Sequence, residues 1–369
     1  MKKRKTLNNK IVFFKQGLMY WHHQHNKRTM PWKGVKDIYR IWLSEVILQQ
    51  TRVEQGMLYY KRFLKAYPDI MALAGASEQE IFKLWEGLGY YSRCRNLIIT
   101  ARVIALERKG VFPDTYEELL KLKGIGPYTA AAIASFGYSI PVPVVDGNVI
   151  RVLSRYFGIE TCIQSSEGKK MIQSLAEQCL DAEQPAAYNQ AIMDFGATIC
   201  KPQLPLCSEC VLKTNCLACQ SSSAHRYPVK LKKNPVKTRW FIAVIMKDHT
   251  GRMAVRQRSE GDIWAQLYEF PSIEFKTEKE WILFNKQNKI SIPFISNDIQ
   301  SVKKNKTYSQ VLSHQKIHVQ TIFCRIQKST HLNIPVEWLT AEEITKLAFP
   351  RIFRDILLEN GIIGLTDSK

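Results

Sequence analysis

Long apolar runs are absent from this sequence of 369 residues. No stretch approaches the roughly 20 apolar residues that a membrane helix needs, so we expect no membrane segment. The basic N-terminus leads into a short apolar run at residues 11–14, which Lys15 ends. This run is too short for the core of a signal peptide, and the sequence therefore does not predict secretion.

Acidic residues are scarce relative to basic ones. The chain has 53 Lys and Arg against 33 Asp and Glu, and its net charge is +20. Such a surplus is typical of a protein that binds a phosphate backbone. Charge alone does not identify the ligand, because acidic membranes, RNA, acidic proteins or a merely solvated basic surface would satisfy it equally.

Strand-like alternation is nearly missing from residues 8 to 218, which show helical periodicity broken by Gly, Pro and Asn. A Ser-, Pro- and Lys-containing stretch follows, and strand patterns begin near residue 240. The length also favours two domains. We predict a mainly α domain at 1–220, a linker at 221–237 and an α+β domain at 238–369. Within the last, we expect a hairpin at 240–257, a strand at 318–326, a helix capped by Thr340 and a final amphipathic helix after Pro350.

Four cysteines, Cys200, Cys207, Cys210 and Cys216, lie within one short segment. Their thiolates could converge on a zinc ion or an iron–sulfur cluster. Among these four only Cys207 and Cys210 form a close pair, whereas zinc sites usually combine two such pairs, which favours a four-iron cluster. Cys219 lies close enough to Cys216 in the sequence to serve as a spare ligand. The remaining cysteines are scattered, as in a reducing compartment, so a disulfide loop is the weaker alternative.

Glu45 interrupts an apolar segment, residues 38–51, whose helical surface is apolar nearly all round. A carboxyl group on such a buried stripe is desolvated, which raises its pKa and suits a general acid near neutral pH. The alternative is a Glu at the mouth of the stripe paired with an arginine. The sequence alone weights these two interpretations equally.

Asp146 stands directly before a helical pattern, and the plain explanation of it is an N-cap. A second interpretation comes from the chemistry of glycosidic bonds. Breaking such a bond takes an acid for the leaving group and an anion that stabilises the cation-like sugar. Glu45 and Asp146 would form that pair if the fold brings them together.

Two glycine motifs point to nucleic acid. Gly124 and Gly126 separate two helical patterns, as in a helix-hairpin-helix whose exposed backbone N–H groups clamp a DNA phosphate. Residues 87–95 combine glycines, tyrosines and arginines, which suits a wedge entering a base stack beside phosphate contacts. Taken alone, each motif is equally explained as a turn between helices.

Taken together, residues 42–51, 87–93, 122–128 and 145–151 and the cysteine spacing resemble the adenine DNA glycosylase family, MutY, of the superfamily that includes endonuclease III. The resemblance implies a mainly α helix-hairpin-helix domain with an iron–sulfur loop, and a Nudix-like α+β domain that inspects 8-oxoguanine. It also implies a monomeric enzyme of the bacterial cytoplasm, associated with the nucleoid when bound to DNA. Its partner would be double-stranded DNA in which adenine is mispaired with 8-oxoguanine or guanine.

By this resemblance Glu45 protonates N7 of adenine and Asp146 stabilises the oxocarbenium ion, with Asn148 and Tyr128 in support. Bifunctional relatives carry a lysine where this chain has Tyr128, so a monofunctional hydrolytic glycosylase is implied. The four cysteines Cys200, Cys207, Cys210 and Cys216 would hold a [4Fe-4S] cluster. The residues implied to contact DNA or 8-oxoguanine are Gln50, Thr51, Leu88, Tyr90, Gly124, Gly126, Ser313 and His314.

The chain departs from the family pattern at a few positions. Leu312 replaces a Phe before Ser313, Lys33 replaces a common Arg, and no acidic Nudix box follows residues 267–271, so nucleotide hydrolysis is not expected. Two other functions stay open. One is an endonuclease III-type glycosylase and lyase, and the other is a non-catalytic iron–sulfur protein that binds DNA or senses redox state.

Overall fold

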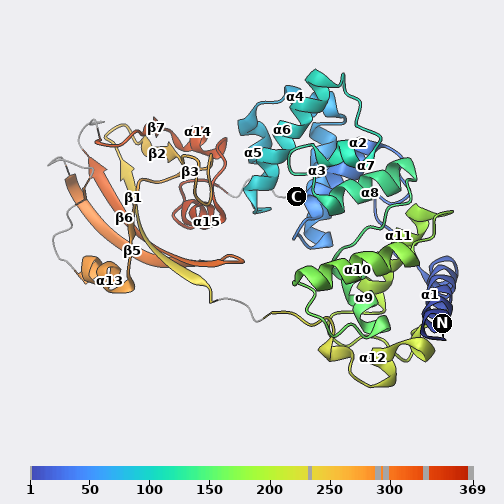
Figure 1. The fold of residues 1–369 in the computed structure, drawn as a ribbon. Coiled ribbons are helices and arrows are strands. Elements are labelled where there is room, and N and C mark those ends of the chain that lie inside the picture. The colour runs from blue at the N-terminus through green and yellow to red at the C-terminus, as the bar shows by residue number, and fades with distance from the viewer. Residues whose placement is uncertain (1, 232–234, 287–291, 294–298, 327–331, 365–369) are drawn as a thin grey trace. The chain divides into compact units, whose positions relative to one another are not determined.

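The computed structural model describes residues 2–231, 235–286, 292–293, 299–326 and 332–364. Two compact units can be separated by their internal contacts. Unit 1 comprises residues 1–75 and 96–233, and unit 2 comprises residues 76–95 and 234–369. Figure 1 shows that unit 1 is helical and that unit 2 is built on a twisted sheet, which confirms the predicted fold class. None of the described helices combines the length and the apolar character that crossing a membrane requires.

Unit 1 contains only helices and the segments that join them in its described part. Its helices are α1 Lys2–His25, α2 Ile38–Leu48, α3 Val53–Ala66, α4 Ile70–Gly75, α6 Tyr91–Glu107 (shared with unit 2), α7 Tyr116–Leu120, α8 Pro127–Tyr138, α9 Gly147–Phe157, α10 Ser166–Cys179, α11 Pro185–Thr198 and α12 Leu217–Gln220.

Helix α2 is a buried helix. Asp37 caps its first turn by accepting a hydrogen bond from the backbone N–H of Arg40, and eight of its eleven residues are buried. A helix that is apolar all round is stable only when it is covered on all sides. Helices α3 and α8 contact it, and Glu45 is therefore held inside the unit.

Helix α9 begins at the predicted Asp146 cap and ends at Gly158, whose φ of 66° is a conformation that glycine adopts without strain. Its apolar stripe, which includes Val149, Val152 and Leu153, packs into a core shared with α1 and α11. This packing fixes the N-terminus of α9, and with it the side chain of Asp146.

Unit 2 is built on a mixed sheet whose described strands run in the order β3-β2-β1-β6-β5. The long strand β1 Lys237–Lys247 is parallel to β6 Gln315–Ile326, and β6 is antiparallel to β5 Ile299–Val311. The pairing of β1 with β2 Met253–Gln257 confirms the predicted hairpin. The other strands are β3 Tyr268–Glu269, β4 Ser272–Phe275 and β7 Glu337–Leu339, and the helices are α5 Glu78–Trp85, α13 Glu278–Lys286, α14 Ala341–Thr345 and α15 Arg351–Glu359. Thr340 forms the expected capping box at α14.

Residues 76–95 belong to unit 2 by their contacts, although they precede most of unit 1 in the sequence. The Lys83 ammonium donates to the carbonyl of Leu347 at 2.9 Å, and Arg95 donates to the carbonyl of Ala265 at 2.9 Å. Part of the segment predicted as a linker is hydrogen-bonded within unit 1, because the carbonyl of Val229 accepts a hydrogen bond from the backbone N–H of Ile163 at 3.1 Å. The division by contacts falls between residues 233 and 234, inside the segment predicted as a linker, and it also assigns residues 76–95 to unit 2.

Candidate active site

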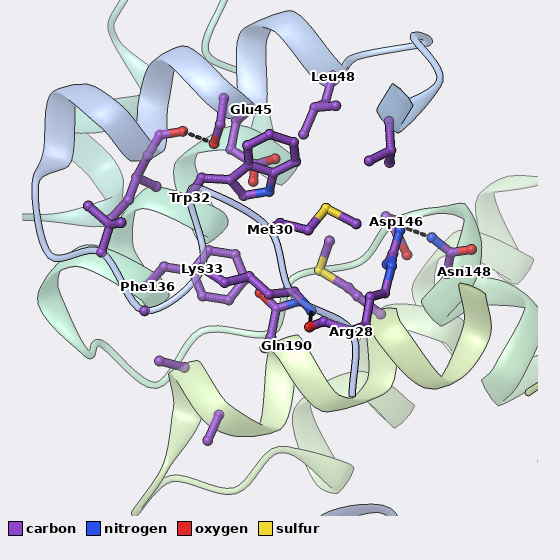
Figure 2. Close-up of a pocket in the computed structure, with 18 of the residues that line it drawn as sticks. Arg28, Met30, Trp32, Lys33, Glu45, Leu48, Phe136, Asp146, Asn148 and Gln190 are labelled. Carbon is purple, nitrogen blue, oxygen red and sulfur yellow. Dashed lines mark hydrogen bonds between the residues drawn. The ribbon is translucent and has the colours of Figure 1, made fainter. Parts of the chain in front are cut away.

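A cavity of about 540 Å³ opens in unit 1 among helices α2, α8 and α11, the start of α9 and residues 26–36. Its volume is in the range of small-molecule sites in proteins. All four side chains predicted to take part in chemistry line it: Glu45, Tyr128, Asp146 and Asn148. Residues separated by about a hundred positions in the sequence thus meet at one site, part of which Figure 2 shows.

Glu45 is 6 % exposed on the buried face of α2. Its pKa is raised to about 7, mainly because the carboxyl group is buried; a hydrogen bond with the Tyr128 hydroxyl opposes this rise, and the nearby Asp146 carboxylate adds to it. No ion pair joins Glu45 to an arginine in the described chain, so the alternative of a salt-bridged glutamate is not what the structure contains. A carboxyl group in this state carries a proton about half of the time near pH 7.

Asp146 combines the two interpretations of the sequence. Its Oδ1 accepts the backbone N–H of Val149 at 2.7 Å as the cap of α9, and its Oδ2 accepts Nδ2 of Asn148 at 2.6 Å. Burial raises the pKa of Asp146, whereas both hydrogen bonds stabilise the carboxylate and lower it. The cap is therefore also an anion held in a fixed orientation at the wall of the cavity.

Arg151 connects this anion to the cysteine segment, a link that was not predicted from the sequence. Its Nη2 donates to Oδ1 of Asn148 at 2.8 Å and to the carbonyl of Gly196 at 2.6 Å, and its Nε donates to the carbonyl of Cys200 at 2.8 Å. Arg151 stands one turn after Asn148, and its position in a polar helical stripe was the only available signal. A continuous chain of hydrogen bonds thus runs from Asp146 to Cys200.

The four predicted ligand cysteines are brought together in unit 1. The pKa of Cys210 is raised to about 12, mainly by burial and in smaller part by the neighbouring thiols of Cys200, Cys207 and Cys216. Thiols this close together disfavour one another's ionisation, and a soft cation bound among them would stabilise the thiolate forms. The donor set therefore fits an iron–sulfur cluster or zinc. Among the described residues, however, no three potential ligands stand at metal-binding geometry.

Cys219 also belongs to this group, because its thiol is hydrogen-bonded to that of Cys207. Cys216 and Cys219 have the same close spacing as Cys207 and Cys210. The spacing favoured a four-iron cluster because only one close pair exists among the four predicted ligands. With Cys219 included the group contains two close pairs, Cys207 with Cys210 and Cys216 with Cys219, and spacing alone no longer separates iron from zinc.

The residues predicted to contact DNA from unit 1 lie at helix ends. Thr51 lines the cavity, and the neighbouring Gln50 is exposed with a left-handed φ of 56°. Gly124 has a φ of +77°, and a Cβ added there would stand 2.5 Å from Cβ of Asn96, so the turn before α8 requires glycine. Gly126 is the N-cap of α8 and is exposed, with Pro127 in the first turn.

The other predicted DNA contacts lie in unit 2. Tyr90 is 40 % exposed with a φ of 47°, whereas Leu88 is only 6 % exposed, so little of Leu88 is available to a ligand in this conformation. Ser313 and His314 are exposed in the turn between β5 and β6, where Oγ of Ser313 and Nδ1 of His314 are 3.1 Å apart.

The comparisons with known proteins identify the class of this fold and site. The HhH-GPD superfamily of base excision DNA repair proteins matches residues 43–189, and the NUDIX domain matches residues 242–359. A thermostable thymine-DNA glycosylase of known structure is similar over 58 % of this chain and 99 % of its own, at 27 % identity and a TM-score of 0.54. A trapped endonuclease III–DNA intermediate also covers 58 % of this chain, and 98 % of its own, at 19 % identity and a TM-score of 0.51; at this identity the similarity concerns the fold only. The chain is a DNA glycosylase of the base excision repair class.

Relatives of similar length identify the family more closely. The adenine DNA glycosylase of Buchnera aphidicola subsp. Acyrthosiphon pisum is 33 % identical over 93 % of this chain and 96 % of its own. The adenine DNA glycosylase of Rattus norvegicus is 31 % identical over 93 % of this chain and 78 % of its own. The chain belongs to the adenine DNA glycosylase family, MutY, and the predicted family is confirmed.

Proposed function

We propose that this protein removes adenine mispaired with 8-oxoguanine or guanine from double-stranded DNA. The observation that carries the proposal is the pairing, in one cavity, of Glu45, whose pKa is raised to about 7, with the oriented carboxylate of Asp146. Cleaving a glycosidic bond requires one carboxyl group that donates a proton and a second, ionised one that stabilises the sugar cation. The adenine would enter the cavity by flipping out of the duplex, which costs least for a mispaired base.

In the proposed reaction Glu45 transfers its proton to N7 of adenine. The bond between C1′ and N9 then breaks, its electron pair goes to the base, and positive charge develops on the sugar. Asp146, held by Asn148 and Val149, stabilises that charge. A water molecule adds to C1′ and releases its proton, which leaves an abasic site and neutral adenine.

Tyr128 limits the chemistry to hydrolysis. Its hydroxyl is hydrogen-bonded to Glu45, and burial keeps its pKa well above the usual value, so it remains a neutral donor. It has no amine that could form a Schiff base with the sugar. This disfavours the endonuclease III-type alternative. Borohydride added during the reaction should trap no stoichiometric covalent complex.

Recognition of the mispair and the cofactor are part of the same proposal. We assign inspection of 8-oxoguanine to unit 2 through Ser313 and His314, and we expect the protein to act as a monomer. Cys200, Cys207, Cys210 and Cys216 would hold a [4Fe-4S] cluster. When bound, that group would fix the basic loop that carries Lys201 and Lys213 beside the duplex.

The test is adenine release by wild type and by Glu45→Gln from a duplex with one 8-oxoguanine:adenine pair, with DNA binding measured in parallel. We expect Glu45→Gln to bind DNA and to release no adenine above background. Unchanged release would refute the role of Glu45. Binding without release by the wild type would instead favour the non-catalytic alternative.

A further inference from the structure

Asp194 is a fully buried carboxylate on α11 that faces three donors from a distant part of the chain. Nδ2 of Asn26 donates to it at 2.9 Å, Nη1 of Arg28 donates at 2.9 Å, and Nζ of Lys33 forms an ion pair with it at 2.5 Å. A carboxylate without exposure is stable in its charged form only with such partners.

These donors belong to the segment of residues 26–36, which contains no helix or strand and forms a wall of the cavity. Arg28 and Lys33 line the cavity together with Trp32, whereas Asp194 is not among the lining residues. The internal hydrogen bonds of the segment include the one that Lys33 donates to the carbonyl of Arg28 at 2.6 Å. The contact with Asp194 therefore joins this wall to α11.

The wall carries basic side chains. Arg28, Lys33 and Lys36 line the cavity that Glu45 and Asp146 also line. In the proposed reaction the electron pair of the broken bond arrives on a base that Glu45 has already protonated, so adenine leaves as a neutral molecule. Donors fixed in the wall of the cavity would act by hydrogen-bonding the base and holding it in the orientation that cleavage needs.

We propose that Asp194 is a positioning residue that holds Arg28 and Lys33 against the base during adenine excision. The inference rests on the proposed function and adds to it. Asp194 contacts no substrate and acts through the segment that it anchors. Neutralising Asp194 should leave Glu45 and Asp146 in place, but the segment of residues 26–36 that carries Arg28 and Lys33 should lose its anchor on α11.

The experiment measures the single-turnover rate of adenine release from a duplex with one 8-oxoguanine:adenine pair. It also measures affinity for the same duplex carrying a non-cleavable adenosine analogue. We expect Asp194→Asn to lower the rate by at least about tenfold and to change affinity by less than about threefold. Glu183→Gln, an exposed carboxylate just before α11, is the matched control and should keep the wild-type rate.

A second set of variants separates positioning from a general loss of structure. If Asp194 acts through Lys33, then Lys33→Met should slow release, Lys33→Arg should be faster than Lys33→Met, and Lys33→Met should add little to Asp194→Asn. Three results would overturn the inference. The first is that the effects of Lys33→Met and Asp194→Asn on the rate are additive, and the second is that Asp194→Asn loses rate and affinity equally. The third is a wild-type rate in either Asp194→Asn or Lys33→Met. If Asp194→Asn does not fold, the Lys33 variants still decide. A wild-type protein without adenine release would refute the proposed function instead.

Discussion

The side-chain amide of Asn148 donates to Oδ2 of Asp146 at 2.6 Å and thereby fixes the orientation of the carboxylate that caps α9. The carbonyl of the same amide accepts a hydrogen bond from Arg151, so the assignment of its nitrogen and oxygen is determined by two partners. Arg151 also holds the backbone of Cys200 and Gly196. One guanidinium group thus supports both the proposed sugar-stabilising anion and the end of α11.

Arg151→Met should therefore reduce both stability and activity. The substitution removes the donor to the carbonyl of Gly196 and the shorter of the two hydrogen bonds to the carbonyl of Cys200, which Arg155 also contacts at 3.4 Å. Unmade buried hydrogen bonds cost about 1–3 kcal/mol each. We expect the free energy of unfolding to fall by about 2–4 kcal/mol and adenine release to slow because Asn148 loses its anchor. Urea unfolding and single-turnover release on the same preparation measure the two effects. A variant with normal stability and normal rate would show that this link is dispensable.

The pKa of Glu45 predicts a pH dependence for adenine release. Its raised value of about 7 means that the protonated form, which the proposed reaction needs, is lost as pH rises above 7. We expect the single-turnover rate to fall about tenfold per pH unit well above that value. Because burial also raises the pKa of Asp146, the rate should fall again at acidic pH as that carboxylate gains a proton. A rate independent of pH between 6 and 9, with DNA binding unchanged, would contradict the role of Glu45 as acid.

The same group should lower the stability of the native protein at neutral pH. The folded-state pKa of Glu45 lies above its unfolded value, so the native state binds more protons between about pH 4.5 and 7, and the free energy of unfolding falls as pH rises through this window. The full effect is about 3 kcal/mol, from about 1.4 kcal/mol per pKa unit. Urea unfolding should therefore show that the free energy of unfolding of wild type, minus that of Glu45→Gln, falls between pH 4.5 and pH 8. The exposed Glu54→Gln is the control, and an equal pH dependence in both variants would contradict the prediction.

The sequence predicted the features of this site that depend on local pattern. The apolar surroundings of Glu45 indicated a buried carboxyl group, and the position of Asp146 before a helical pattern indicated a cap. Periodicity reports which helix face is buried but not which polar partners meet inside. Asp194 binds side chains 161 to 168 positions away, and no local pattern encodes that contact. A motif also does not reveal the burial of one side chain, and the structure shows Leu88, a residue predicted to contact DNA, to be only 6 % exposed.

The identity of the metal at the cysteine group can be decided through Cys219. We expect iron bound by Cys200, Cys207, Cys210 and Cys216, in which case Cys219→Ser should retain the wild-type iron content and visible absorption. Cys207→Ser should lose both, because it removes a ligand. In a zinc site built on the two close pairs, Cys219→Ser would also lose its metal, and the wild-type protein would contain zinc without visible absorption. Iron and zinc content, measured on protein purified without oxygen, therefore separates the two ligand sets, and loss of iron in Cys219→Ser would refute the assignment of the four ligands.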